Sequence, residues 1–238
     1  MDLLTYENLI ALLTLTSLEV ILGIDNIVFI AILASRLKPE QRDLARKLGL
    51  AVAVVSRLLL VFCLSWVMGL TRELFVMLEH PFTGKDIVLV VGGLFLIGKA
   101  THELHNRVEG HADLEHSAGK VATLGTVLIQ VAFIDIIFSL DSVITAVGMV
   151  QSVAIMAAAI ILSVAIMLIF SKSITDFISK YPTVKILALS FLLLIGVMLV
   201  ADGFGQHIPK GYIYFAMAFS LFVEMLNIRA TAKKVAAA

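Results

Sequence analysis

Two apolar stretches that contain paired acids decide the fold: LEVILGIDNIVFIA at residues 18–31 and IDIIFSLDSVITA at residues 134–146. Each stretch carries two carboxylic acids six positions apart, and a small polar residue follows the second acid. The acids are Glu19 and Asp25 in the first stretch, and Asp135 and Asp141 in the second. A helix needs about 20 mostly apolar residues to cross a bilayer. The two stretches therefore predict membrane-spanning helices that arose by duplication.

Composition agrees with a membrane location. Hydrophobic residues make up 60% of the 238 residues, and the mean hydropathy is +1.03, which exceeds what a soluble domain needs for its core. We therefore expect membrane lipids as partners. The chain has 18 basic and 18 acidic residues, and no basic block is interleaved with aromatic residues, so we expect no nucleic-acid partner.

Apolar stretches long enough to span the membrane recur along the chain, and all four prolines lie between them. We predict an all-α integral membrane protein with about seven transmembrane helices in a single domain, residues 1–238. The predicted spans are residues 8–34, 48–70, 86–101, 121–150, 153–171, 184–202 and 211–228.

A second repeated motif, LxLIG, occurs at residues 94–98 and again at residues 192–196. Together with the acid motifs it predicts two copies of a three-helix unit, at about residues 8–104 and 121–203. Because three is odd, the second copy enters the membrane in the opposite sense, which makes an inverted repeat. A cytoplasmic loop at about residues 102–120 joins the copies, and an extra helix follows at about residues 211–228.

Basic residues near the span ends predict the orientation. They collect after the first span and in alternate connections, whereas the opposite loops hold only Arg72, Lys85 and Lys210. This pattern predicts a multi-pass protein with its N-terminus outside and its C-terminus in the cytoplasm. We expect its location to be the bacterial cytoplasmic (inner) membrane.

Acids within the predicted spans are the main indication of function. Each ionised acid in a membrane costs roughly 2.5–3.5 kcal/mol on insertion scales. If all were ionised, Arg57 alone would leave a net charge of about −4, so protons or bound cations must compensate. The alternative is that the acids are protonated or hydrogen-bonded between helices only to fix packing. The acids are Glu19, Asp25, Asp135, Asp141 and Glu224.

Helix geometry places these acids at two depths. Antiparallel copies put Glu19 and Asp141 toward the outer side, and Asp25 and Asp135 toward the inner side, about 9 Å away at 1.5 Å per residue. Such levels suit either two metal positions or one metal position with a proton-handling acid nearby.

Residues seven apart share a helix face, so Glu19 aligns with Asn26, and Asp135 aligns with Ser142. The second acid of each motif points elsewhere unless the helix unwinds. We predict such a distortion at Gly23 and Ser139, which would free backbone carbonyls as further ligands. The alternative is that these small residues allow close helix packing.

The last span adds Glu224 and Asn227, which share a face and could complete the inner part of the site or form an interhelical contact. Arg57 could act as a counter-ion when no metal is bound. All candidate ligands offer oxygen, which suits manganese, magnesium or calcium better than zinc or copper.

At these residues the chain resembles the TerC family of membrane proteins, whose hallmarks appear here as EVILGIDN, DIIFSLDS and VEMLN. The resemblance covers nearly the whole chain. It implies manganese export from the cytoplasm and a relation to the LysE-type exporter fold. It also implies the metal ligands Glu19, Asp25, Asn26, Asp135, Asp141 and Ser142.

Other functions compete with this interpretation. A calcium or magnesium transporter would use the same ligands. An intramembrane aspartyl hydrolase could use facing aspartates, but neither a YD nor a GxGD pattern is present, so we expect no enzyme. A non-transport scaffold is a third class. No GxxxxGK[ST] loop occurs, which favours a secondary transporter with protons as a candidate coupling ion.

Overall fold

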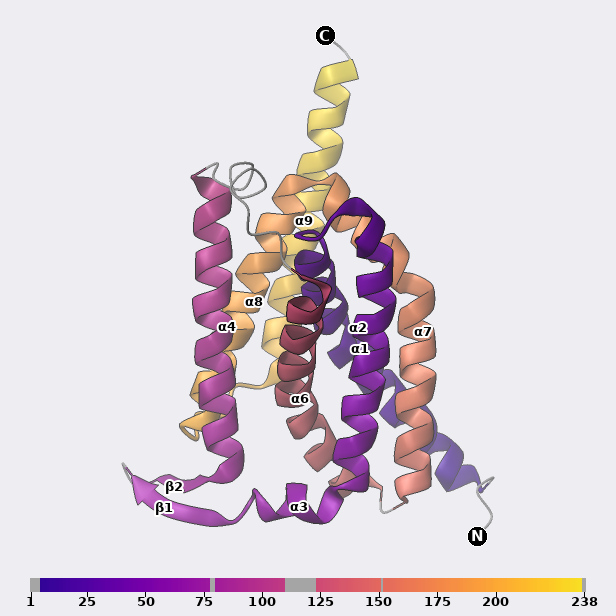
Figure 1. Ribbon diagram of the computed structural model, residues 1–238, viewed down its shortest axis with the longest axis vertical. Coiled ribbons are helices and arrows are strands. Elements are labelled where there is room, and N and C mark those ends of the chain that lie inside the picture. The colour runs from indigo at the N-terminus through magenta and orange to yellow at the C-terminus, as the bar shows by residue number, and fades with distance from the viewer. Residues whose placement is uncertain (1–4, 78–79, 110–122, 151, 237–238) are drawn as a thin grey trace.

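The computed structural model describes residues 5–77, 80–109, 123–150 and 152–236, except for the side chains of Ile24, Asp25, Ser65, Met77, His80 and residues 232–236. Within these ranges the protein is a bundle of long helices (Figure 1), which confirms the all-α membrane fold. The long helices are α1 (Tyr6–Ala34), α2 (Pro39–Phe62), α4 (Gly84–Val108), α6 (Leu124–Met149), α7 (Val153–Lys180), α8 (Pro182–Gly203) and α9 (Lys210–Ala236).

Capping residues explain where several helices begin. The Thr5 and Thr123 side chains accept hydrogen bonds from backbone amides in the first turns of α1 and α6. Thr83 forms a reciprocal capping box with Asp86 at the start of α4. Pro39 and Pro182 start α2 and α8, where the missing N–H would be unsatisfied in any case.

The second predicted span differs from the structure. It was expected at residues 48–70, but α2 already begins at Pro39 and ends at Phe62, and a short helix α3 (Leu64–Gly69) follows. Six described helices are long and apolar enough to cross a membrane, and α2 is not among them. The reason is charge, because α2 carries Arg46, Lys47 and Arg57. Arg46 and Arg57 are nevertheless buried, whereas Val55 and Leu59 are exposed, so one face of α2 turns its arginines into the bundle and another face lies on the outside.

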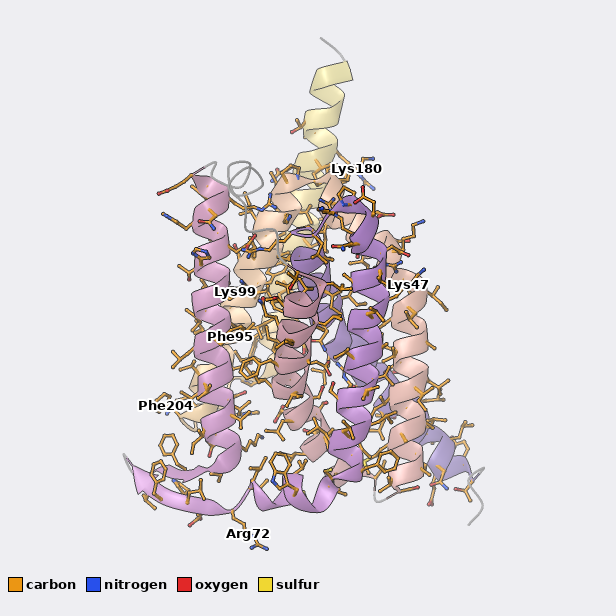
Figure 2. All side chains as sticks on the ribbon, viewed as in Figure 1. Lys47, Arg72, Phe95, Lys99, Lys180 and Phe204 are labelled. Atoms are coloured by element: carbon orange, nitrogen blue, oxygen red, sulfur yellow. The ribbon has the colours of Figure 1, made fainter. Side chains whose placement is uncertain are left out.

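A short hairpin of β1 (Glu73–Met77) and β2 (His80–Thr83) interrupts the helical pattern between α3 and α4. It lies at the end of the bundle where α8 finishes (Figure 2), and the Phe82 ring packs edge-on against Phe204 at a centroid distance of 5.7 Å. The predicted loop from residue 102 is also wrong at its start, because α4 continues through Val108. Residues 110–122 of that loop lie outside the described part of the chain.

Successive long helices run in alternating directions, and the labelled chain ends lie at opposite ends of the bundle (Figure 1). As a result α1 and α6, which carry the two acid motifs, are antiparallel. The main contacts between long helices pair α4 with α8, α1 with α7, and α2 with α6. Exchanging α1, α2 and α4 for α6, α7 and α8 reproduces these pairings. Two related units would give this pattern, and their common origin stays a prediction.

The α4–α8 contact is a close backbone approach. A Cβ added to Gly93 would lie 2.6 Å from the Gly196 carbonyl oxygen, and one added to Gly196 would lie 2.9 Å from the Gly93 carbonyl oxygen. Only glycine permits such an approach. Gly196 belongs to the second LxLIG motif, so this motif serves packing between the two halves.

Helix α9 lies at the margin of the bundle, and its main contacts are with α8. An apolar cavity of about 590 Å³ separates part of α9 from α1, α7 and α8, with Tyr214 and Leu221 on its α9 side. Phe215 and Phe219 are exposed on the opposite face of α9. The buried core is therefore formed by the other long helices.

A candidate metal-binding site inside the bundle

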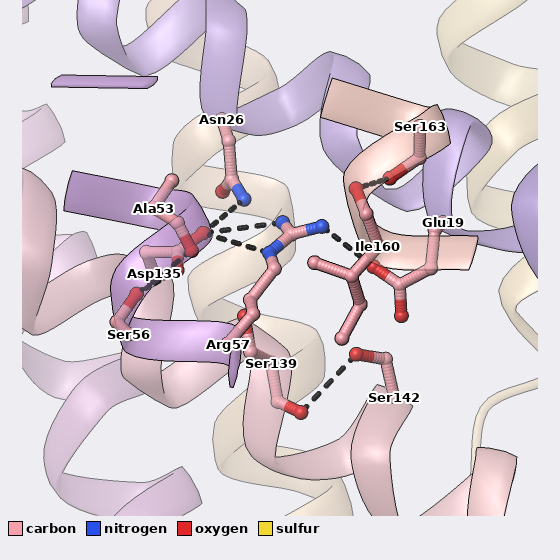
Figure 3. Close-up of polar contacts among 10 residues, drawn as sticks. All are labelled: Glu19, Asn26, Ala53, Ser56, Arg57, Asp135, Ser139, Ser142, Ile160 and Ser163. Atoms are coloured by element: carbon pink, nitrogen blue, oxygen red, sulfur yellow. Dashed lines mark hydrogen bonds and ion pairs between the residues drawn. The ribbon is translucent and has the colours of Figure 1, made fainter. Parts of the chain in front are cut away.

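Arg57 on α2 bridges the first acids of the two motifs (Figure 3). Its Nη1 donates to Glu19 Oε2 on α1 at 2.6 Å, and its Nε and Nη2 donate to Asp135 Oδ1 on α6 at 3.2 and 3.1 Å. Arg57 is 2% exposed, and both acids are buried. These ion pairs agree with the interpretation of Arg57 as a counter-ion.

Asp135 is the most heavily bonded acid of the site. Besides Arg57, its Oδ1 accepts from Asn26 Nδ2 at 2.8 Å. Its Oδ2 lies 2.5 Å from the Ser56 hydroxyl oxygen on α2. Helices α1 and α2 thus both supply polar groups to one carboxylate on α6, which links the three helices.

Ser56 was not expected at this site from the sequence. No motif surrounds this residue, and only its place one position before Arg57 on a helix that packs against α6 brings it to Asp135. A polar residue beside the intramembrane arginine is the one signal that could have indicated it.

The charges of this cluster do not balance. Two carboxyl groups face one guanidinium, so ionisation of both would leave one negative charge in a buried environment, where charge is costly unless it is paired. Asn26 Oδ1 and Ser139 Oγ are also buried, and neither has a hydrogen-bond partner. Ser142, one turn after Ser139, is buried and donates to the Ser139 carbonyl oxygen at 3.1 Å. The cluster thus combines spare negative charge with unused oxygen acceptors nearby on α1 and α6.

Asp141 belongs to a second cluster and not to the Arg57 cluster. It accepts from Lys85 Nζ on α4 at 2.7 Å and from Lys210 Nζ on α9. Both lysines were expected in loops, but they lie at the starts of α4 and α9, and their long side chains reach inward to the acid. The expected charge imbalance was therefore too large, because Arg57 is not the sole base among the buried acids.

A small cavity of about 30 Å³ joins the two clusters, and it is large enough for a water molecule or a bare ion. Its polar lining comes from Arg57, Asp141, Ser142, Asp202 and Lys210. Asp202 was not singled out from the sequence, because it lies near the end of α8 and outside both acid motifs. The cavity gives the two clusters a common polar space.

The predicted distortions at Gly23 and Ser139 are wrong, because α1 and α6 continue as helices through both positions. Gly23 instead allows close packing, since an added Cβ would clash with the sulfur atom of Met167 on α7. Ser139 is a buried position on α6. The small residues therefore serve the packing alternative, and they free no backbone carbonyls.

Two other predicted ligands stand apart or cannot be placed. The backbone of Asp25 lies within α1, but its side chain is outside the described part of the structure. Glu224 on α9 is half-buried, and it lies on the helix face shared by Leu221, which lines the large cavity, and Ile228. Asn227 is exposed. No described hydrogen bond or ion pair joins Glu224 or Asn227 to the Arg57 cluster.

Among the described residues, no group of three or more His, Cys, Asp or Glu side chains lies close enough together to hold a metal ion. Arg57 stands between Glu19 and Asp135, and Asp141 is engaged by lysines. Each of these three acids is therefore already ion-paired with a basic side chain.

Comparisons with known proteins define the family. The profile described as "Integral membrane protein TerC family" matches residues 4–236. The chain is 51% identical to a "UPF0053 protein" of Haemophilus influenzae over 94% of both chains, and 48% identical to "UPF0053 inner membrane protein YgdQ" of Escherichia coli over 92% of both. It is also 51% identical to "UPF0053 inner membrane protein YoaE" of Escherichia coli, over 91% of this chain but 42% of that protein. No solved structure matches. The chain belongs to the TerC family of integral membrane proteins.

Proposed function

We propose that this protein is a secondary transporter of the bacterial inner membrane that exports a divalent metal cation, with manganese as the substrate. The observation that carries the proposal is the bridging of Glu19 and Asp135 by Arg57. Two buried carboxylates from antiparallel helices share one tethered cation, and a mobile cation could take its place.

Charge supports this exchange. A divalent ion bound by Glu19 and Asp135 would balance both carboxylates, which Arg57 alone does not. The same ion would make Arg57 an excess positive charge, so metal binding requires the guanidinium to move away. Arg57 and the metal thus compete for the acids, and release of one accompanies binding of the other.

The available donors favour a hard ion. The amide oxygen of Asn26 and the hydroxyl of Ser142 are oxygen donors close to the acids in the fold, and the described site contains no histidine or thiol. Manganese, magnesium and calcium prefer such ligands. Calcium or magnesium transport through the same site is the alternative, and competition experiments separate the three ions.

A path through the bundle follows from the two clusters. Asp141, held by Lys85 and Lys210, shares the small cavity with Arg57 and would be the next acid toward the predicted outer side. The motif places Asp25 correspondingly toward the inner side. Alternating access then means that the two three-helix units rock against each other, with protons or the membrane potential as the driving force. We propose no catalytic activity.

The test is manganese flux into proteoliposomes that contain the purified protein. Glu19→Gln and Asp135→Asn should abolish flux, whereas the exposed-site controls Glu40→Gln and Asp176→Asn should retain it. Calcium, magnesium and zinc added as competitors rank the ions. Absence of flux in the wild type under every gradient would reject transport and favour a non-transport scaffold.

A further inference from the structure

One end of the bundle is built around a buried lysine that no motif of the sequence singles out. At this end α1 and α4 finish, and α2 and α8 begin (Figure 1). Lys185, in the first turn of α8, is 7% exposed. Its Nζ donates to the Ser35 hydroxyl oxygen, just after α1, at 2.5 Å.

Basic side chains surround this lysine. Arg36, Arg42 and Arg107 all lie close enough for their guanidinium groups to repel the Lys185 ammonium group electrostatically. Glu103, the buried acid on α4 at this end, is ion-paired with Arg36. In the described part of the chain no carboxylate pairs with Lys185.

The usual excess of basic residues on the cytoplasmic side of membrane proteins does not explain this arrangement. That excess is met by exposed residues such as Lys38 and by Lys180, which lies at the same end of the bundle (Figure 2). A lysine is almost never fully buried unless it is paired, and burying an ammonium group beside other cations adds repulsion. Among the described residues, no carboxylate offsets the charge of Lys185.

We propose that the Lys185 cluster binds a phosphate-bearing anion, and that its source is the headgroup of an anionic phospholipid. The ammonium group of Lys185 has three donors, of which Ser35 takes one. Arg42 donates through Nε to the Leu37 carbonyl oxygen, and its guanidinium has four further N–H groups. Such donors suit the oxygens of a phosphate.

The position of the cluster favours a lipid as the source. It lies at the ends of helices that cross the membrane, which is the depth of phospholipid headgroups, and basic pockets between such helices recognise anionic headgroups. The site lies away from the Arg57 cluster, so the inference does not depend on which ion is transported.

Binding of fluorescent phosphatidylglycerol to the purified protein in neutral-lipid nanodiscs tests the site. Lys185→Met and Arg42→Gln should each weaken binding about tenfold or more, because each removes charge-assisted hydrogen bonds to the bound phosphate group. The matched control Lys180→Met, in which an exposed lysine is lost, should bind like the wild type. Lys185→Arg should retain binding, because it keeps the positive charge. If Lys185→Met fails to insert into the membrane, Arg42→Gln still tests the site.

Inorganic phosphate as a competitor identifies the source. Competition that is weaker with phosphate than with unlabelled phosphatidylglycerol supports a lipid headgroup, whereas phosphate that competes as effectively as the unlabelled lipid would support the anion site and overturn the lipid as its source. Equal binding by the wild type, Lys185→Met and Arg42→Gln would overturn the site altogether. Manganese flux is measured on the same variants. Lipid binding and manganese flux are then scored independently, so a failure of one proposal is not mistaken for a failure of the other.

Discussion

Asn26 Nδ2 donates a 2.8 Å hydrogen bond to Asp135 Oδ1, so the amide that follows the second acid of one motif contacts the first acid of the other. This bond joins the two motifs directly, and Arg57 joins them a second time through Glu19 and Asp135.

Loss of Arg57 should make the fold depend on metal. In Arg57→Met, Glu19 and Asp135 keep their burial without a counter-ion, which costs about 3–5 kcal/mol in the free energy of unfolding. Manganese should restore most of that loss because it replaces the missing charge. Thermal unfolding in detergent, with and without manganese, measures both effects. A variant whose stability does not respond to manganese would contradict binding at these acids.

Ser56 should matter for metal affinity although it lies outside both motifs. Ser56→Ala removes a hydrogen bond to the Asp135 carboxylate, which is worth about 1.5–3 kcal/mol for a charged partner. We expect manganese affinity, measured by equilibrium dialysis, to fall at least about tenfold, because the carboxylate loses a partner that orients it. Ser190→Ala, which removes an exposed hydroxyl bonded to its own helix, is the control and should have no effect.

Asp141 should depend on its two lysines. In the wild type, Asp141→Asn removes both ion pairs, whereas in Lys85→Met/Lys210→Met the same change removes none. A double-mutant cycle on the free energy of unfolding should therefore give a coupling energy of about 0.5–3 kcal/mol. Additive effects would show that these ion pairs contribute nothing to the folded bundle.

The two LxLIG glycines should differ in their tolerance of alanine. Gly196→Ala places a Cβ against the Gly93 carbonyl oxygen and should destabilise the α4–α8 contact by about 1–3 kcal/mol. Gly98→Ala is the matched control, because an added Cβ there meets no atom within 4 Å. Alanine at Gly98 should be neutral or stabilising. Equal losses of thermal stability in both variants would contradict the observed packing.

Manganese affinity should depend on pH, because protons and the metal ion compete for the same carboxylates. Carboxylates must be ionised to hold a metal ion, so acidification should weaken manganese affinity and alkaline conditions should strengthen it. Equilibrium dialysis of the wild type across a pH series measures this dependence. An affinity that does not change with pH would count against protons as the coupling ion.

Much of the fold could be predicted because hydropathy and proline positions are local signals. The acids and Arg57 could be found for the same reason, since each is a charged residue in an apolar run. The partners of these acids could not be predicted in full. Ser56 reaches Asp135 only through the crossing of α2 and α6, and Lys85 and Lys210 reach Asp141 only because long side chains extend inward from helix starts.

The helix distortion at Gly23 failed as a prediction for a related reason. A glycine between two acids fits both an unwound turn and a close helix contact, and the sequence near it is the same in both cases. The deciding neighbour is Met167 on α7, which is distant in the chain. The role of a residue whose contacts come from distant parts of the chain could not be predicted from the sequence around it.

The glycine contact between α4 and α8 also bears on motion. Backbones that touch at Gly93 and Gly196 cannot approach further, and drawing them apart would sacrifice the tightest packing between the two halves. Rotation about the contact keeps it intact, whereas translation does not. In the proposed rocking of the two halves, this crossing would act as the pivot, and side chains far from it, at the two ends of the bundle, would travel the greatest distance.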